Sequence, residues 1–214
     1  MNALVAIRAH LRRFRADERG TTLVELTLAL SCFLLILFGM IDYGRLSYHH
    51  TTGEKAMHLV ARVAVVRPPA CAGVPTTNAR GPAITTPPPR FGDSCSVTTG
   101  ACVNPGEVTC LGSAANPTAA EIWGLVGSGM PPGTTISNLR FRYTFDEDLG
   151  FLGGPYVPMV TVELENTAFV FVSPLGQLVR LGGGTAPQSL GASITLPSFS
   201  VSMPAEDLAQ GMDG

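Results

Sequence analysis

The sequence predicts an α+β fold, in which a long N-terminal transmembrane helix precedes a small antiparallel-sheet domain with a disulfide-stapled loop region. Three observations predict it. An apolar run from Leu23 to Ile41 has Glu25 as its only charged side chain. Four cysteines lie in a proline-rich stretch behind it. Further on, apolar and polar residues alternate, as in half-buried strands.

Composition limits the class of protein. A chain of 214 residues allows one domain, or a small domain with appendages. The net charge of −2 argues against a nucleic-acid binder, which would normally have a basic face. Charged residues make up only 14% of the chain, which is sparse for a freely soluble cytosolic protein.

The apolar run is long enough to cross a membrane. Its nineteen residues would reach about 28 Å as a helix, close to the roughly 30 Å of a bilayer core. Five arginines precede it, against Asp17 and Glu18. The positive-inside rule therefore places the N-terminus in the cytoplasm and everything after Ile41 across the membrane. A secretory signal peptide fits poorly, because no small-x-small cleavage site follows the run.

Glu25 is costly in such a segment. On insertion scales a charge at mid-bilayer costs roughly 2.5–3.5 kcal/mol, so an acid there is by default a functional-site hypothesis. The helix dipole and interfacial water reduce the cost near the helix N-terminus, and a nearby cation would offset more of it.

The residues around the start of the apolar run resemble a known signal, and this resemblance offers a role for Glu25. "DERG" followed by "TTLVE" resembles the type IV prepilin signal, in which a membrane peptidase cuts after the glycine. The resemblance implies cleavage between Gly20 and Thr21, which would make Glu25 the fifth residue of the mature chain. It also implies that Glu25 pairs with the free N-terminal amine of a neighbouring subunit during assembly.

A narrower resemblance covers about Arg13 to Val66. The R-G-x-x-x-V-E start, the leucine-rich run, "FGMIDYGR" at its exit and "EKAMHLVARVAVV" resemble the TadE-like pseudopilins of tight-adherence (Flp) pilus systems. "PMVTVELENTAFVF" and "MPAEDLAQ" are similar in character. Thr21 and Thr22 depart from the alanines more usual there.

This resemblance implies a minor pseudopilin that takes part in pilus assembly. The partners it implies are a prepilin peptidase, the major Flp-type pilin and other pseudopilins, the inner-membrane assembly platform and the lipid bilayer. The expected location is the bacterial inner membrane, single-pass, with a periplasmic C-terminal domain, and pilus association follows if the subunit enters the fibre. The alternative is an unprocessed single-pass anchor that presents a periplasmic binding domain.

The order of segments follows from these features. We expect a leader at 1–20, a transmembrane helix half at 21–41 and its periplasmic continuation at 42–66. A loop region at 67–117, an α+β domain at 118–203 and a tail at 204–214 follow. Pro68-Pro69 should end the helix, and Gly44 and Gly53 are points where it could bend or break.

The loop region holds an even set of cysteines outside the membrane: Cys71, Cys95, Cys102 and Cys110. In an oxidising periplasm this predicts two disulfides. Three pairings are possible, of which we favour the nested one, Cys71–Cys110 with Cys95–Cys102. A zinc site would need close paired spacings that are missing. Cys32, within the apolar run, is interpreted as a small packing residue.

The last domain is expected to be a small sheet packed on the helix. A short helix begins near Thr118, with one apolar side made of Ile122, Trp123, Leu125 and Val126. "SNLRFRYTF" and "MVTVEL" alternate as strands, and "DEDLGFLGGP" between them reads as a turn. "SITLPSFSVSM" changes its alternation at Pro197, which predicts an edge strand with a bulge.

No motif supports catalysis. His50, Glu54 and His58 share a helical spacing, but a solvated stripe is favoured over a metal site. Asp146, Glu147 and Asp148 lack a calcium loop around them and read as part of a hairpin turn. "LGGGTA" lacks the lysine of a phosphate loop, and Ser128 lacks the elbow of a hydrolase. We therefore predict no catalytic residues, no metal, no cofactor and no enzymatic activity.

Overall fold

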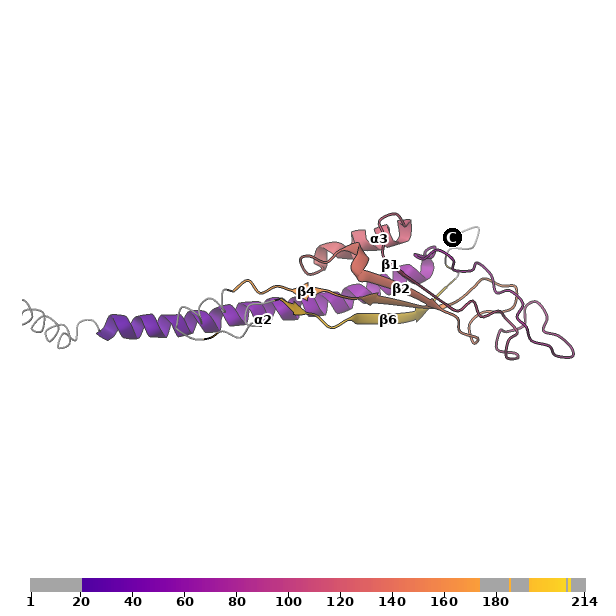
Figure 1. Cartoon of the computed structure of the whole chain (residues 1–214), viewed down its shortest axis with the longest axis horizontal. Helices are drawn as coiled ribbons and strands as arrows, with labels where there is room; N and C mark the ends of the chain where they lie inside the picture. The colour runs from indigo at the N-terminus through magenta and orange to yellow at the C-terminus, as the bar shows by residue number, and fades with distance from the viewer. Residues whose placement is uncertain (1–20, 174–184, 186–192, 207, 209–214) are drawn as a thin grey trace, which may run out of the picture. The chain divides into compact units, whose positions relative to one another are not determined.

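A computed structural model describes residues 21–173, 185, 193–206 and 208 (Figure 1). The chain divides into two compact units. The first combines Met1–Arg45 with Phe171–Gly191, and the second combines Leu46–Val170 with Ala192–Gly214. The predicted leader at 1–20, including Gly20, and most of the predicted tail lie outside the described residues.

The long helix, α2, extends over Thr21–Val66 without interruption. The bend or break considered at Gly44 and Gly53 is not found, because both glycines keep helical conformation. The helix ends where predicted. The Arg67 N–H donates to Val63 O at 3.1 Å, and Pro68-Pro69 then follows. Proline has no N–H to donate and disfavours helical geometry in the residue before it, so the helix cannot continue.

The second unit contains a four-stranded antiparallel sheet in the order β1-β2-β3-β6. Its strands are β1 (Glu107–Leu111), β2 (Leu139–Thr144), β3 (Met159–Leu164) and β6 (Phe199–Pro204). The alternation predicted for β2 and β3 is confirmed. Phe141 stands opposite Val162, which stands opposite Val201, and the inward residues of β2 and β3 are fully buried.

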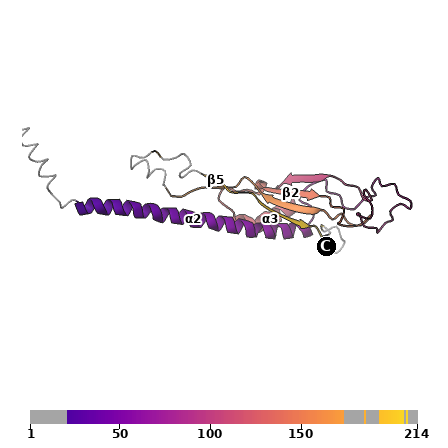
Figure 2. The ribbon, with the colours of Figure 1, turned by 90° about the horizontal axis from the view of Figure 1, so that it is seen from below.

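The C-terminal part of α2 supplies the other half of this core (Figure 2). Met57, Val60 and Ala64, at helical spacing, are all 0% exposed and belong to the same apolar cluster as the inward side chains of the sheet. Fully burying one such large side chain stabilises a fold by roughly 1.5–3 kcal/mol. This part of α2 is therefore a core helix of the second unit.

A second helix, α3 (Pro117–Val126), also packs on this core. Asn116 caps it, with its Oδ1 accepting from Ala119 N at 3.0 Å, and Pro117 occupies the first turn. Ile122 and Val126 are buried, as predicted. Leu125, expected on the same side, is 54% exposed, because its position on the helix points it to solvent. Short 3₁₀ turns follow at η2 (Gly127–Gly129) and η3 (Ile136–Asn138).

The segment after β3 differs from prediction. Asn166 has a positive φ of 55°, and the chain then forms β4 (Ala168–Phe169), which pairs with β5 (Ile194–Thr195) in a separate two-stranded sheet. The prediction of one bulged strand over β5 and β6 is wrong. The two belong to different sheets, because the ladder stops at 196–198, around Pro197. The edge position of β6 is confirmed.

The connection between β2 and β3, where the sequence predicts a turn, does join two antiparallel neighbours, but it is longer than a simple hairpin turn. It covers residues 145–158 and docks on the cysteine-containing loops through isolated bridges at Thr77–Pro155 and Ser94–Phe151. Leu152 is buried against the Cys95 and Cys102 side chains. The loop region thus shares a small core with this connection. The loop region also contains β1, a strand that its proline- and threonine-rich composition does not predict.

Candidate functional site

The membrane-type part of α2 presents an apolar surface. From Leu23 to Ile41 the large side chains are exposed or half-buried, with Leu28 at 71% and Met40 at 69%. In the described part of the chain, α2 is the one helix long and apolar enough to cross a membrane, with a mean hydropathy of 2.4 in its most apolar window. Such a surface is stable only when lipid or other apolar helices cover it.

The hydroxyl groups of Thr27 and Ser31 in this run are already satisfied. The Thr27 hydroxyl donates to Val24 O at 2.8 Å, and the Ser31 hydroxyl donates to Thr27 O at 2.7 Å. These bonds to the helix's own backbone remove the need for a polar partner in lipid. Cys32 is a free, exposed cysteine, so the packing role predicted for it is not formed within the described residues.

Glu25 is different. Its side chain is exposed and has no hydrogen-bond or ion-pair partner among the described residues. The helix dipole acts most strongly in the first turn of a helix. Because α2 begins at Thr21, Glu25 lies just beyond that turn. The dipole therefore offsets little of the cost of this charge, and the carboxylate needs water or a cation from elsewhere.

Asp42, the first residue after the apolar run, is in the opposite situation. Its side chain is 3% exposed and forms an ion pair with Arg45 at 3.2 Å. It accepts hydrogen bonds from Val172 N at 3.2 Å, from Ser173 N at 3.1 Å and from the Ser173 hydroxyl. All these residues belong to the first unit. Asp42 thus holds a segment that lies 130 residues further along the chain.

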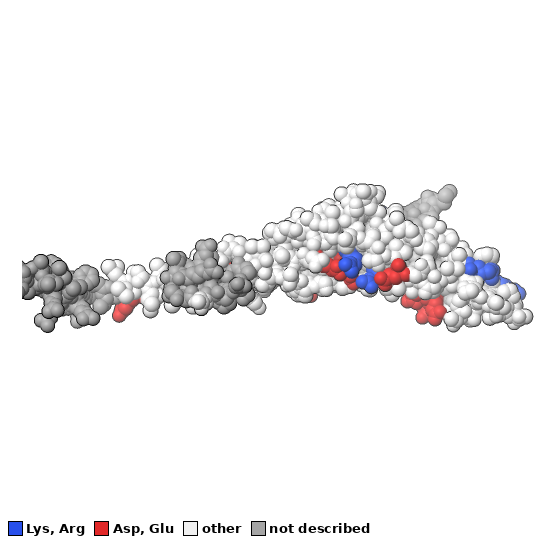
Figure 3. Space-filling view, viewed as in Figure 1, with Lys and Arg blue, Asp and Glu red and all other residues white. Residues whose placement is uncertain are grey.

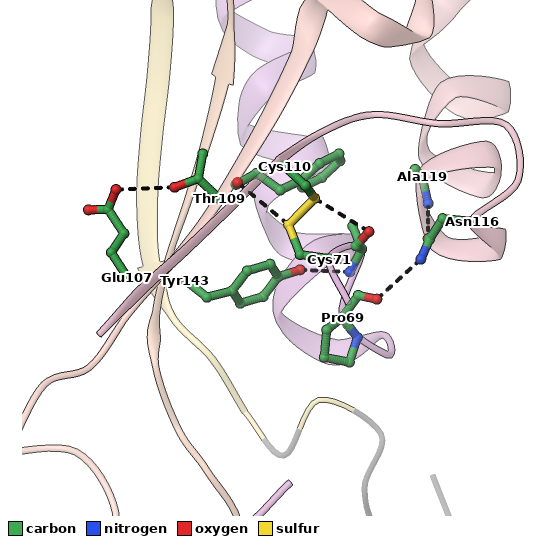
Figure 4. Close-up of a disulfide and its surroundings, with 10 residues drawn as sticks. Pro69, Cys71, Glu107, Thr109, Cys110, Asn116, Ala119 and Tyr143 are labelled. Atoms are coloured by element: carbon green, nitrogen blue, oxygen red, sulfur yellow. Dashed lines mark hydrogen bonds between the residues drawn. A yellow bond between two sulfur atoms is a disulfide. The ribbon is translucent and has the colours of Figure 1, made fainter. Parts of the chain in front are cut away.

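The C-terminal end of α2 is tied to the sheet by a disulfide (Figure 4). Cys71 and Cys110 are bonded, with 5.6 Å between their Cα atoms. Beside them, the Tyr143 hydroxyl accepts a hydrogen bond from Ala70 N at 2.9 Å. Burial raises the pKa of Tyr143, and the Ala70 hydrogen bond offsets part of that effect. The second disulfide joins Cys95 to Cys102, so the favoured nested pairing is confirmed.

Polar contacts to α3 hold the same chain segment. Arg67 forms a two-pronged ion pair with Glu121, with N···O distances of 3.1 and 2.9 Å. The Thr118 hydroxyl donates to Pro68 O at 2.8 Å. Together with the disulfide, these contacts fix the Arg67–Cys71 segment from both sides, so its role is structural.

Paired charges cover the outer face of the sheet. Arg142 lies 3.3 Å from Glu107 and 3.6 Å from Glu163, and Arg140 lies 2.8 Å from Glu165. In Figure 3 basic and acidic side chains lie next to one another on the domain. Because the charges neutralise one another across neighbouring strands, this face has no single-sign field that would attract an ionic substrate.

The histidines on α2 do not form a metal site with neighbouring ligands in the described part of the chain. His50 and Glu54 are 3.9 Å apart. His58 instead lines a groove of about 620 Å³ with Glu54, Met57 and residues 198–202. Asp148 N donates to Asp146 Oδ1 at 3.0 Å, so this acidic trio forms a turn of its own within the longer connection.

The site at the start of α2 also has a counterpart among known families. Residues 20–62 match the family model of TadE-like proteins. No curated protein and no solved structure matches the chain. The TadE-like segment contains Gly20, Thr21 and Glu25, together with Asp42 and most of the core-forming part of α2.

Within residues 20–62, Glu25 stands out in the sequence as a candidate site residue, whereas Asp42 does not. By sequence, Asp42 is only one of four balancing charges after the apolar run. One local signal is available, because an acid directly at the end of an apolar run, with arginine three residues later, indicates a helix-surface pair. Its backbone partners at residues 172 and 173 have no signal of their own in the sequence.

Proposed function

We propose that this protein is a minor pseudopilin that takes part in the assembly of a tight-adherence pilus. It is inserted with its N-terminus in the cytoplasm and trimmed after Gly20 by a prepilin peptidase. The apolar residues of 21–41 then pack in the membrane and against the helices of other pilins. Its role is structural, and the second unit, in the periplasm, caps or primes the fibre.

One observation carries this proposal. Glu25 is exposed on an apolar helix and has no partner among the described residues. The match to TadE-like proteins begins at the proposed cleavage site. Cleavage at Gly20 would create an α-amino group at Thr21, four residues before the acid. The amine of one subunit and Glu25 of the next would then neutralise each other in a low-dielectric environment, where such a pair is strong.

Mass spectrometry of the purified membrane protein tests the first step. In a strain with an active prepilin peptidase we expect an N-terminus at Thr21, and Gly20→Ala should leave the leader in place. A wild-type chain that still begins at Met1 in that strain would contradict the proposal and favour the unprocessed anchor.

Co-purification with the major pilin tests the second step. Glu25→Ala should leave trimming intact and lower recovery with the pilin, because the amine of the neighbouring subunit loses its counter-charge. Glu25→Gln should behave alike, since it keeps the size and removes the charge. Glu54→Ala, an exposed glutamate on the same helix outside the apolar run, is the matched control and should change nothing. If all three variants were recovered with the major pilin as well as the wild type is, Glu25 would have no role in assembly.

A further inference from the structure

The Asp42 site is a second polar feature of the first unit, and pilin assembly does not account for it. Its carboxylate is buried although it lies on a helix whose neighbouring residues Ile41 and Tyr43 are 51% and 71% exposed. Four groups bind it: two backbone N–H groups, one hydroxyl and one guanidinium. The backbone and hydroxyl donors come from residues 171–173, which we call the strap.

The position of Asp42 along α2 gives this site a location. Asp42 follows Glu25 by 17 residues, which is about 26 Å at ~1.5 Å per residue. A bilayer core is about 30 Å thick, so a helix with Glu25 near one surface brings Asp42 near the other. A carboxylate at that depth is poorly hydrated, and several charge-assisted hydrogen bonds are needed to offset its desolvation.

The strap supplies three of these four bonds and is itself mostly apolar. Val172 is 72% exposed, while Phe171 and Ser173 on either side are half-buried. The strap carries no charged side chain. Since Val172 N bonds directly to Asp42, the exposed valine is held at the level of Ile41 and Tyr43. Tyrosine is enriched at this level of membrane proteins, where its ring bridges the apolar and polar layers.

We propose that the strap is a second membrane-contacting element, which Asp42 clamps to α2 so that Val172 inserts into the interfacial layer of the bilayer. The occupant of this surface is lipid, because the strap continues the apolar surface of residues 23–41 at its outer end. The inference rests on the membrane insertion contained in the proposed function. A single buried residue thereby converts a one-helix anchor into a two-point attachment.

Tryptophan fluorescence in lipid vesicles tests the proposal. The native tryptophan is removed by Trp123→Phe, and a single new one is introduced into the full chain by Val172→Trp, Ile41→Trp or Ile84→Trp. Ile41 is the last residue of the apolar run, and Ile84, at 98% exposed, serves as the solvent reference. The proteins are reconstituted in phosphatidylcholine vesicles with brominated acyl chains, which quench tryptophan only at close range.

We expect fluorescence of the Val172→Trp protein to be quenched and blue-shifted nearly as much as that of Ile41→Trp, while Ile84→Trp is unaffected. If Ile41→Trp is quenched and Val172→Trp behaves like Ile84→Trp, the strap faces water or another protein and the inference is wrong. If Ile41→Trp itself escapes quenching, membrane insertion fails and with it the proposed function. The two failures are therefore distinguishable.

The clamp is tested by adding Asp42→Ala to the tryptophan-bearing proteins. Quenching at position 172 should fall, because the strap loses its acceptor, whereas quenching at position 41 should stay the same. Ser173→Ala removes only the hydroxyl donor and should have an intermediate effect. Unchanged quenching at position 172 in both variants would show that Asp42 does not hold the strap and would overturn the clamp.

Discussion

Two buried tyrosines in the second unit couple stability to alkaline pH. Tyr156 is 2% exposed and stacks on Phe145, with ring centroids 6.5 Å apart. Burial raises the pKa of Tyr156 to about 12, from an ordinary value of 10.0. Tyr143 is fully buried, and its pKa is raised for the same reason. In both cases the folded state holds the phenolic proton more tightly than the unfolded state does.

Below pH 10 both states keep the proton, so the shift has no effect on stability. Between pH 10 and about 12 the unfolded chain releases the proton of Tyr156 and the folded chain does not, so the free energy of unfolding falls as pH rises. Tyr156 contributes roughly 1 kcal/mol per pH unit in that window, and Tyr143 acts in the same direction.

Tyr156→Phe should therefore flatten this alkaline decline without changing its direction, because Tyr143 still titrates. The free energy of unfolding is measured by urea titration at several pH values from about 8 to 12, the range in which linkage predicts the decline. Near-UV circular dichroism monitors the unfolding. Tyr48→Phe is the exposed control. A decline as steep in Tyr156→Phe as in the wild type would show that this phenol does not contribute.

At the scale of single elements, α3 offers a pair of glycines in contrasting surroundings. Gly124 lies in the helix interior, and a Cβ there would meet nothing within 4 Å. Gly127 caps the helix, and a Cβ there would lie 2.9 Å from the Trp123 ring. Glycine in a helix interior costs roughly 0.5–1 kcal/mol relative to alanine, so only the first site gains from substitution.

We expect Gly124→Ala to raise the free energy of unfolding by about 0.5–1 kcal/mol. Gly127→Ala should lower it by about 1 kcal/mol or more, because the half-buried indole has to move to avoid overpacking. Calorimetric melting of the two variants beside the wild type measures both changes. Shifts of the same sign would contradict the packing described around Trp123.

At the scale of the whole molecule, the two disulfides close loops of different length. Cys71–Cys110 spans 39 residues of sequence, and Cys95–Cys102 spans 7. In the chain-entropy model the longer loop stabilises by about 4 kcal/mol and the shorter by about 2 kcal/mol. The longer one also joins the segment behind α2 to β1, so its loss disturbs contacts to the main core.

The double variant Cys71→Ser, Cys110→Ser should therefore lose more stability than Cys95→Ser, Cys102→Ser. The first should lower the urea midpoint of the entire second unit, as followed by Trp123 fluorescence. The second variant is the matched control, since it removes the same chemistry from a small peripheral cluster. Equal losses in the two variants would show that loop length does not govern their stability.

The sequence predicts most of the fold where local pattern and tertiary environment agree. Three patterns each predict a single structure. The apolar run predicts the long helix, the alternating residues predict β2 and β3, and the even set of cysteines predicts two disulfides. β1 escapes prediction because "EVTCL" is short and follows a proline- and threonine-rich stretch. Its strand character comes from pairing with β2 and from the Cys71–Cys110 disulfide, and both lie outside any local window.

The same limit applies to the candidate site. Glu25 can be found because a charge inside an apolar run is a local anomaly. The role of Asp42 depends on backbone N–H groups 130 and 131 residues away, which every non-proline residue carries. The turn predicted after β2 is present, but the length and docking of the whole connection could not be predicted, because the connection takes its shape from the loops on which it docks.

The end of α2 has a mechanical consequence. Its last turns are buried in the core, and Cys71, five residues beyond Val66, is bonded covalently to β1. A pull on the helix would therefore load strands and helix together in shear, and the disulfide would stop the segment from peeling away. Force applied to the end of α2 would therefore reach the sheet through a covalent bond as well as through the buried core, so the helix end resists separation from the strands.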